Sequence, residues 1–430
     1  MEGVRLRHCF HPVYDPSFHR IKDGYKKVCE TRDAAYVDEN AFNVQVQDIR
    51  VSIEQLKALS EKLQDRYLVH HKGWDRLNSS PYKRKCTIDD FSILSILGSG
   101  TWGKVSLVQR KEMKENKLFA IKALSKNHLI DSKGVARAFC ERNILASLSH
   151  TFIVKMHAAF QSEDSLFLVL EYCAGGDLFS HLASCQCFNE QIARFYVAEI
   201  ILALEYLHGQ GILYRDVKPE NILLDACGHI KLSDFGLAKI GVFDSNKGAS
   251  TICGTPNYMS PEVIRGQQYG LSVDWWSLGI AMYDMLVGYP PWFYPNEEIE
   301  VTFRGIKFEP LRFSARLNLS RKVKNLMLLL LQKKSHNRLG NDGAEEVKAH
   351  PFFQKIDWQD LEAKKITPPI QIDQIQHSEV EEKIKDALTM NIKHTSASNT
   401  PAPMFNAIGF SYCSSPDAWW QADPEMHSLK

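Results

Sequence analysis

RDVKPEN at residues 215–221, followed by DFG at residues 234–236, is the stretch that decides how this chain folds and what chemistry it can perform. It supplies two carboxylates, an amine and an amide, on Asp216, Asp234, Lys218 and Asn221. A carboxylate such as Asp216 can accept the proton of an alcohol, and Lys218 can neutralise a migrating phosphoryl group. Asn221 and Asp234 can hold the Mg²⁺ that bridges phosphate oxygens. The spacing therefore predicts phosphoryl transfer to a hydroxyl group.

A glycine-rich turn lies upstream, between two stretches in which apolar residues alternate as they do in strands, residues 91–97 and 105–108. Glycines let backbone amides approach phosphate oxygens, and an aromatic residue at the tip can cap them. A dinucleotide-binding fold would require a helix directly after the glycines, whereas this chain continues as a strand. The predicted nucleotide contacts are Leu97, Gly98, Ser99, Gly100, Thr101, Trp102, Gly103 and Val105.

One lysine stands inside the next apolar strand, predicted at residues 118–124. This is Lys122, and a helical pattern at residues 135–148 places Glu141 on the same face as Ala138, Leu145 and Leu148. Because both side chains point inward and need a partner, we expect Lys122 and Glu141 to pair. The pair would position Lys122 on the α- and β-phosphates of a nucleotide. The alternative is a strand-end lysine beside a solvated helix face.

On these motifs the chain resembles the protein kinases over residues 91–353, and within them the AGC group of cyclic-nucleotide-dependent, protein-kinase-B-like and ribosomal-protein kinases. Further details typical of that group are Tyr214 before Arg215, Gly175-Gly176-Asp177, Thr251-Ile252-Cys253-Gly254-Thr255-Pro256 and Asp274-Trp275-Trp276. The resemblance implies an α+β bilobal protein-kinase fold. A small β-rich N-lobe and a larger helical C-lobe would hold ATP in the cleft between them.

The resemblance also implies where the adenine of ATP would lie. The backbone of the hinge residues Glu171 and Cys173 would bind the edge of the adenine, next to Leu170 as the gatekeeper. Apolar side chains would cover its two faces, namely Val105, Ala120 and Leu223. The chain departs from the family pattern at Ser260, where an Ala is usual. Glu262 would pair with Arg338 inside the C-lobe, as part of the fold rather than of the chemistry.

We expect three parts in the chain: an N-terminal extension at residues 1–88, the catalytic domain at residues 91–353 and an AGC-type tail at residues 354–430. Residues 49–67 have the apolar spacing of one amphipathic helix. Such a helix would bind a partner or, as is more common, pack on its own catalytic domain or form a short coiled coil.

The composition argues against several classes of protein. The 52 Lys and Arg residues balance 51 Asp and Glu, so the bulk charge does not favour nucleic acid or a membrane surface. No apolar run approaches the roughly 18 residues of a membrane span. Ten cysteines without C-x-x-C spacing indicate reduced thiols, and therefore a cytoplasmic or nuclear location.

Three acids are expected to read the substrate. By resemblance, Asp177 and Glu220 would read an Arg three positions before the phosphoacceptor, and Asp284 a nearer position, because carboxylates bind guanidinium groups in a bidentate way. The alternative for Asp177 and Asp284 is that they are surface acids. Thr255 and Lys218 favour Ser or Thr over Tyr as the acceptor. The expected partners are proteins with basic residues near a Ser or Thr.

Thr251 occupies the position of the activation-loop phosphate in this group. We expect three cations around it: Arg137, Arg215 and Lys239. A phosphothreonine there would order the loop and dock the helix that carries Glu141. An upstream activating kinase is therefore an expected partner.

The end of the tail resembles the hydrophobic motif of the group, with Ser411 as phosphoacceptor. That motif requires an aromatic residue, two further residues and a second aromatic residue, but Ala407 stands three positions before Phe410. The sequence is compatible with a tail segment that docks on the N-lobe and with one that does not.

Three functions fit the sequence: an active Mg·ATP-dependent Ser/Thr kinase, a pseudokinase scaffold acting through its extension or tail, and a small-molecule kinase of related fold. The filled catalytic positions count against the scaffold. Glu262, Arg338 and the loop at Thr255 favour a protein acceptor.

Overall fold

The structure, a computed structural model, describes residues 86–100, 103–111, 117–129, 132–314, 317–372, 407 and 410–414. The chain divides into two compact units, Met1–Arg84 and Lys85–Lys430. All of the described residues belong to the second unit. The helix predicted at residues 49–67, the tip of the glycine turn at Thr101 and Trp102, and Phe405 in the tail lie outside the described residues.

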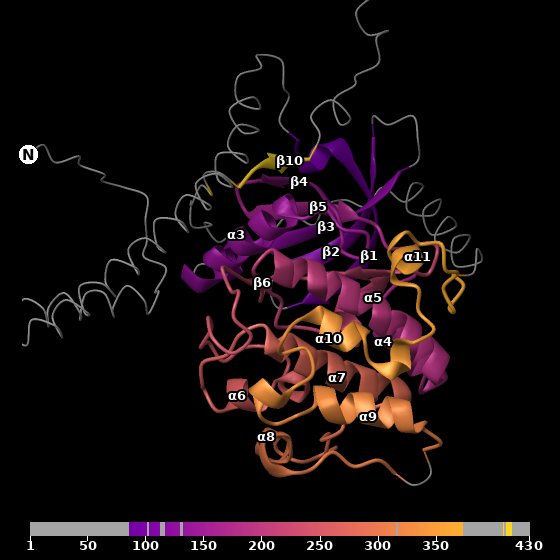
Figure 1. The fold of residues 1–430 in the computed structure, drawn as a ribbon. Coiled ribbons are helices and arrows are strands. Elements are labelled where there is room, and N and C mark those ends of the chain that lie inside the picture. The colour runs from indigo at the N-terminus through magenta and orange to yellow at the C-terminus, as the bar shows by residue number, and fades with distance from the viewer. Residues whose placement is uncertain are drawn as a thin grey trace, which may run out of the picture. The chain divides into compact units, whose positions relative to one another are not determined.

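The N-lobe is built on one antiparallel sheet, with the strand order β1-β2-β3-β5-β4-β10 (Figure 1). Its strands are β1 (Phe91–Gly100), β2 (Gly103–Arg110), β3 (Leu118–Ser125), β4 (Met156–Gln161), β5 (Ser165–Glu171) and β10 (Tyr412–Cys413). The turn between β1 and β2 is followed directly by a strand, as predicted, so the helix that a dinucleotide-binding fold requires is absent at this position. Phe91, Phe160 and Phe167 stack on one face of the sheet. Helix α3 (Ser132–Ser147) brings Ala138, Ile144 and Leu145 into the larger core.

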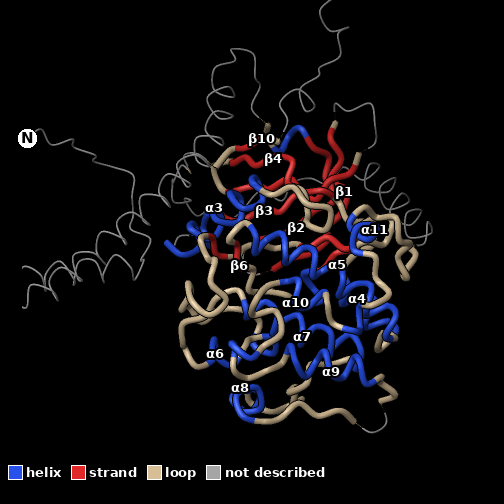
Figure 2. The backbone as a smooth tube through the Cα atoms, in the orientation of Figure 1, coloured by secondary structure: helices blue, strands red, loops and turns tan. Residues whose placement is uncertain are grey.

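The C-lobe is mainly helical, as the blue segments of Figure 2 show. Its longest helices are α5 (Glu190–Gly209) and α7 (Ser272–Val287); the others are α4 (Leu178–Cys185), α6 (Pro261–Ile264), α8 (Ile299–Phe308), α9 (Arg321–Leu330), α10 (Ala344–Lys348) and α11 (Trp358–Glu362). Almost all of α7 is buried, since its sequence is apolar on every side. The helix ends at Gly288, whose left-handed backbone (φ 93°) favours glycine.

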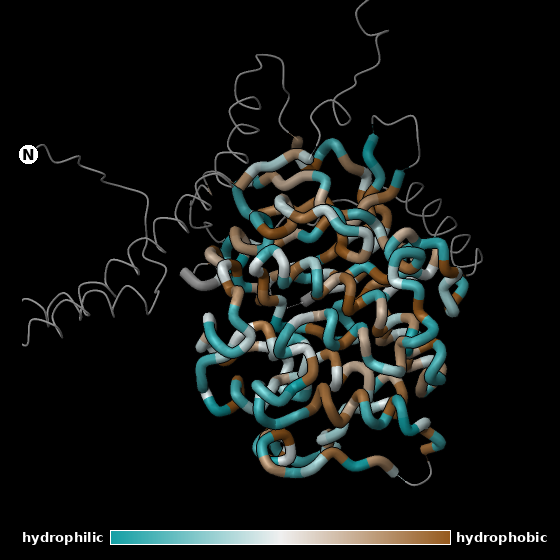
Figure 3. The backbone as a smooth tube through the Cα atoms, in the orientation of Figure 1, coloured by the Kyte–Doolittle hydropathy of each residue, from teal (hydrophilic) through white to brown (hydrophobic). Residues whose placement is uncertain are grey.

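Two small two-stranded sheets hold the loops that carry the chemistry. β6 (Ile212–Leu213) pairs with β9 (Lys239–Ile240), and β7 (Ile222–Leu224) pairs with β8 (Ile230–Leu232). Residues 214–221 lie between β6 and β7, and residues 233–238 lie between β8 and β9. The two pairings therefore bring RDVKPEN and DFG side by side. Hydrophilic segments lie mostly at the outside of the fold (Figure 3). The predicted α+β bilobal protein-kinase fold is confirmed.

The tail segment docks on the N-lobe, which answers the question that the sequence left open. β10 pairs with β4 through Tyr412 and Cys413. Phe410 is fully buried, with its ring 5.4 Å edge-on from Phe139 of α3. Where the motif would have an aromatic residue, the main chain of Ala407 exchanges two hydrogen bonds of 3.0 Å with the amide of Gln161.

The pair of Glu262 with Arg338 is present in the C-lobe core. The guanidinium nitrogens lie 2.7 and 3.0 Å from the two carboxylate oxygens. Arg338 also donates to the main-chain oxygens of Ser272 and Gln332. Burial acts to raise the pKa of Glu262, but the Arg338 charge outweighs it and lowers that pKa. The pair is therefore ionised and fully bonded.

A search of the described ranges finds no helix that is both long enough and apolar enough to cross a membrane.

Candidate active site

Lys122 and Glu141 meet in the N-lobe, as their sequence patterns predict. Lys122 lies in β3, opposite Val105 of β2, and its Nζ lies 2.7 Å from Glu141 Oε1 and 3.1 Å from Asp234 Oδ1. Burial acts to lower the pKa of Lys122, but the charges of Glu141 and Asp234 outweigh it and raise that pKa. Lys122 therefore stays cationic, and it joins the N-lobe to the DFG segment.

The carboxylate of Asp216 is held on several sides. Asn221 Nδ2 donates to Asp216 Oδ2 at 2.7 Å and to its main-chain oxygen at 2.9 Å. Lys218 Nζ lies 3.0 Å from the same Oδ2, and Thr255 Oγ1 donates to Oδ1 at 2.9 Å. Lys218 also donates to Thr255 Oγ1 at 2.8 Å. The Asp216 carboxylate is thus oriented in advance, and its Oδ1, which accepts from Thr255, keeps a lone pair for an incoming hydroxyl.

Asp274 of α7 fixes the main chain of this loop, a role that the sequence reasoning missed. Its fully buried carboxylate accepts hydrogen bonds from the amides of Tyr214 (3.0 Å) and Arg215 (2.8 Å). His208 of α5 lies 2.8 Å from the same carboxylate. Arg215 has a left-handed backbone (φ 70°), which these bonds help to hold. A buried Asp in a largely apolar helix is a sequence signal that could have pointed to this role.

Asp234 turns towards the cleft. Its backbone is left-handed (φ 53°), a conformation that Asp tolerates better than most residues, and the Gly236 amide donates to its Oδ1 at 3.3 Å. Phe235 is buried with its ring 5.2 Å from Tyr214. Burial acts to raise the pKa of Asp234, but the Lys122 charge outweighs it, so that pKa is lowered. The Asp234 carboxylate is therefore ionised.

Asn221 and Asp234 fit a divalent cation. Asn221 Nδ2 donates both of its hydrogen bonds to Asp216, so the amide oxygen of Asn221 is turned away from Asp216. An amide oxygen and a carboxylate are hard oxygen donors of the kind that Mg²⁺ takes.

A cavity of about 360 Å³ opens where these groups converge. Its lining includes Gly103, Val105, Lys122, Glu141, Asp216 and Asp234. A Cβ on Gly103 would lie 1.8 Å from the Ala123 oxygen, so this glycine is also required by the packing of β2 on β3. The β1–β2 hairpin contains the other described glycine-turn residues, Gly98, Ser99 and Gly100, and Gly100 pairs with Gly103.

Of the described residues predicted around adenine, Val105 lines this cavity, whereas Ala120, Leu170, Glu171, Cys173 and Leu223 do not. Ala120 pairs with Leu170 in the sheet, and Glu171 ends β5 with its carboxylate 2.9 Å from Lys231. Cys173 is buried, and Leu223 forms a main-chain bridge to Asp177. Leu97 is half-exposed near the glycine turn. Their contact with adenine stays a prediction.

The three acids predicted to read the substrate differ in their environments. Asp177 caps α4, and its Oδ1 accepts from the Ser180 amide at 2.7 Å. Glu220 is exposed and lies within the loop at residues 214–221, the catalytic loop. Asp284 is buried, so it is not the surface acid of the alternative, and Tyr258 donates to it at 2.5 Å. Burial raises the pKa of Asp284 to about 6. The Tyr258 hydrogen bond acts to lower that pKa, and the negative charge of Glu220 acts to raise it.

This raised pKa predicts a pH-dependent gain in stability from Asp284→Asn. The carboxyl has a folded pKa of about 6 against a model value of 3.8. The folded state therefore binds more protons than the unfolded state between those values, and stability falls as pH rises through that window. At pH 7.5 the ionised carboxylate costs about 3 kcal/mol, which the amide would relieve.

Urea unfolding of the wild type and Asp284→Asn at several pH values would measure this effect. The advantage of the variant should shrink steadily as pH is lowered from 7.5 towards 4. Asp89→Asn, at an exposed position, is the matched control and should show no such trend. An Asp284→Asn advantage that is absent at pH 7.5 would contradict the raised pKa.

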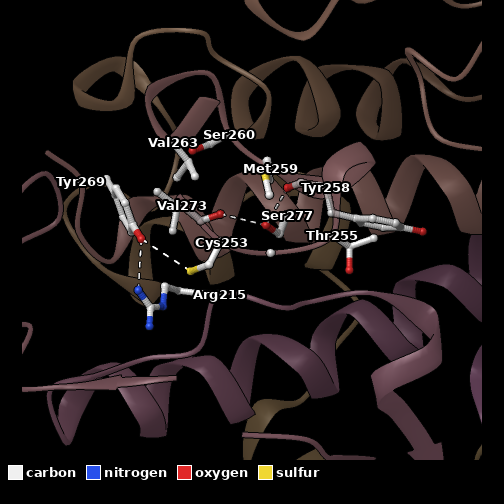
Figure 4. A pocket seen from close by; sticks show the side chains of 11 residues that line it. Arg215, Cys253, Thr255, Tyr258, Met259, Ser260, Val263, Tyr269, Val273 and Ser277 are labelled. Atoms are coloured by element: carbon white, nitrogen blue, oxygen red, sulfur yellow. Dashed lines mark hydrogen bonds between the residues drawn. The ribbon is translucent and has the colours of Figure 1, made fainter. Parts of the chain in front are cut away.

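Thr251 is exposed, and the Tyr269 hydroxyl donates to its carbonyl oxygen. Figure 4 shows Arg215 bonded to the same hydroxyl. Arg215 donates to the Leu237 oxygen at 2.6 Å and to the Tyr269 hydroxyl at 3.1 Å. Of the other two predicted cations, Arg137 lines the large cavity beside Glu141, and Lys239 lies in β9. Sequence reasoning did not identify Tyr269, because it lies 54 positions from Arg215 outside any motif.

Comparison with known proteins bears on the same region. Residues 91–353 match the family model described as protein kinase domain. The serine/threonine-protein kinase gad8 of Schizosaccharomyces pombe is 44% identical over 66% of this chain and 48% of that protein. The RAC serine/threonine-protein kinase of Drosophila melanogaster is 45% identical over 68% and 47%, and the serine/threonine-protein kinase Sgk1 of Danio rerio 46% over 65% and 64%. The chain spans about a third to two thirds of the length of the curated relatives it matches.

Proposed function

Because the chain belongs to the protein kinase family, with RAC and Sgk relatives that place it in the AGC group, we propose that it transfers the γ-phosphoryl group of ATP to Ser and Thr hydroxyls of proteins. The observation that carries this proposal is the carboxylate of Asp216, oriented by Asn221, Lys218 and Thr255 on the cavity that Lys122 and Asp234 also line. The scaffold alternative has no support in this site, since each catalytic position is both filled and engaged.

Each side chain has one task in this mechanism. Asp216 accepts the proton of the incoming hydroxyl, and Lys218, 3.0 Å from it, neutralises charge on the migrating group. Lys122, held by Glu141, positions the α- and β-phosphates. When bound through Asn221 and Asp234, Mg²⁺ supplies charge neutralisation on the phosphate oxygens. Thr255, bonded to both Asp216 and Lys218, fixes the side on which the acceptor hydroxyl must enter.

The proposal extends to control and substrate choice. Phosphorylation of Thr251 by an upstream kinase would raise turnover, because Arg215 is already linked to that segment. Glu220 would read an upstream Arg, since its exposed carboxylate lies in the catalytic loop. Asp177 would bind an upstream Arg with the carboxylate lone pairs that its hydrogen bond to the Ser180 amide leaves free.

A peptide-library assay with the purified full-length chain and Mg·ATP tests this function. We expect transfer to Ser and Thr peptides with Arg upstream, and its loss in Asp234→Asn. Glu220→Gln should reduce the Arg preference about tenfold, as loss of one charge-assisted contact does. Asp177→Asn is the matched variant, because Asn caps a helix as well as Asp does while removing the charge.

The outcomes separate activity from specificity. An Arg preference that is unchanged in both variants would contradict the substrate proposal and leave the kinase activity standing. Absence of transfer by the wild type, even with phosphate on Thr251, would contradict the kinase proposal itself.

A further inference from the structure

One tyrosine hydroxyl joins the catalytic loop to the main chain at Thr251. Arg215 Nη1 donates to Tyr269 Oη at 3.1 Å, and Tyr269 Oη donates to the Thr251 carbonyl oxygen at 2.5 Å. In Figure 4 the hydroxyl is joined by dashed lines to the guanidinium and to the Cys253 sulfur, which lies 3.9 Å from it. The contact at Thr251 is made to the backbone, so it does not depend on the side chain that would be phosphorylated.

Tyr269 is fixed in place by its surroundings. Its amide and carbonyl exchange two hydrogen bonds of 2.9 Å with Ala249 of the activation segment, residues 234–262. Its ring, 1% exposed, belongs to an apolar cluster with Leu213, Val242 and Val273. The hydroxyl is therefore presented to Arg215 by a rigid support.

Tyr269 is buried in this contact, whereas Arg215 is half-buried and Thr251 is exposed. The cavity that Tyr269 and Arg215 line has a volume of about 10 Å³, at the lower limit for a single water molecule. If the hydroxyl were removed, a replacement water would have to fit this small cavity and bond to Arg215 and to the Thr251 oxygen at once. A buried donor that loses its partner without replacement is unfavourable.

Arg215 connects both ends of the activation segment to the catalytic base. Its Nε donates to the Leu237 oxygen near the start of the segment, and Tyr269 carries the link to Thr251 in the second half of the segment. Its own amide is held by Asp274, directly before Asp216. A shift of this arginine would therefore be felt at the base.

We propose that Tyr269 is a positioning residue that holds the activation segment against the catalytic loop while Thr251 carries no phosphate. This inference rests on the proposed kinase function. A phosphate on Thr251 would give Arg215 a charge-assisted partner, which is stronger than a neutral hydroxyl. The tyrosine hydroxyl then sets the turnover of the unphosphorylated enzyme and becomes dispensable in the phosphorylated one.

The test compares Tyr269→Phe with the wild type in two forms of the full-length chain, one unphosphorylated and one with phosphothreonine encoded at position 251. The variant keeps the ring and removes the hydroxyl. In the unphosphorylated form we expect kcat/KM to fall about tenfold, and in the phosphorylated form to stay within about twofold. Activation by phosphate should therefore grow about tenfold in the variant.

Two further variants complete the test. Tyr283→Phe loses a hydroxyl that donates to the Arg312 oxygen in the C-lobe, and it should leave both forms unchanged. Thr251→Ala keeps the carbonyl that Tyr269 binds, so it should retain the turnover of the unphosphorylated wild type even if Tyr269→Phe does not fold.

An equal loss in both forms of Tyr269→Phe would assign the hydroxyl a merely structural role and overturn the proposal, as would no loss in either. A Thr251→Ala chain that falls below the unphosphorylated wild type would overturn it as well. If phosphate fails to activate the wild type, the proposed control at Thr251 is wrong, while the effect of Tyr269→Phe on the unphosphorylated chain is still measured.

Discussion

Replacing Asp216 with Ala should lower kcat for a Ser or Thr peptide by about 10²-fold or more, the range that loss of a positioned general base gives. Affinity for ATP should hardly change, because Asp216 is held by Asn221, Lys218 and Thr255 on the acceptor side of the site. The substitution leaves the Lys122 contacts with Glu141 and Asp234 in place.

Steady-state kinetics with nucleotide-binding titrations would check this prediction. Asp164→Ala, at an exposed turn between β4 and β5, is the matched control and should have wild-type kcat. Normal turnover by Asp216→Ala would remove the residue from its role as base. A large loss of ATP affinity would instead place its effect on the nucleotide side.

Breaking the pair of Glu262 with Arg338 should cost about 3–5 kcal/mol of unfolding free energy, because the remaining charge would be buried alone. The Arg338 side chain is fully buried, and Glu262 occupies two of its nitrogens. We therefore expect Glu262→Leu to be strongly destabilising. The double variant Glu262→Leu with Arg338→Met should recover much of the loss, since it removes both charges together.

Denaturant unfolding of the single and double variants forms a cycle that measures this coupling. Lys365→Ala provides a contrast, because its pair with Asp360 is exposed to solvent and its loss should leave the stability nearly unchanged. A Glu262→Leu chain as stable as the wild type would show that the buried arginine is satisfied by the main-chain oxygens of Ser272 and Gln332 alone.

Several features of the site could be predicted because their parts are close in sequence or share one periodic element. The alternation in residues 91–97 and 105–108 predicted the hairpin that became β1 and β2. Lys122 was the polar exception in an apolar strand, and Glu141 lay on the apolar face of a helix, so each required a buried partner. The cap at Asp177 was also local, three positions before Ser180, and a capping analysis of the sequence could have found it.

Other contacts could not be predicted because their partners are far apart in sequence. The Ala407 backbone meets Gln161 across 246 positions, although Ala407 breaks the aromatic pattern on which docking was judged. Asp274 binds the Arg215 amide across 59 positions, and Thr255 reaches Asp216 across 39. Resemblance pointed to some of these residues without supplying the atoms they would touch.

The sequence by itself determined which elements form and which side chains carry the chemistry, since strand and helix periodicity and the spacing within RDVKPEN act over a few residues. Only the tertiary structure decided how the base is oriented, that Asp284 is buried, and that Tyr269 links Arg215 to Thr251. These depend on how separately folded segments pack against one another. A hydrogen bond requires placement to within a few tenths of an ångström, which the close packing of a whole core fixes and no local pattern encodes.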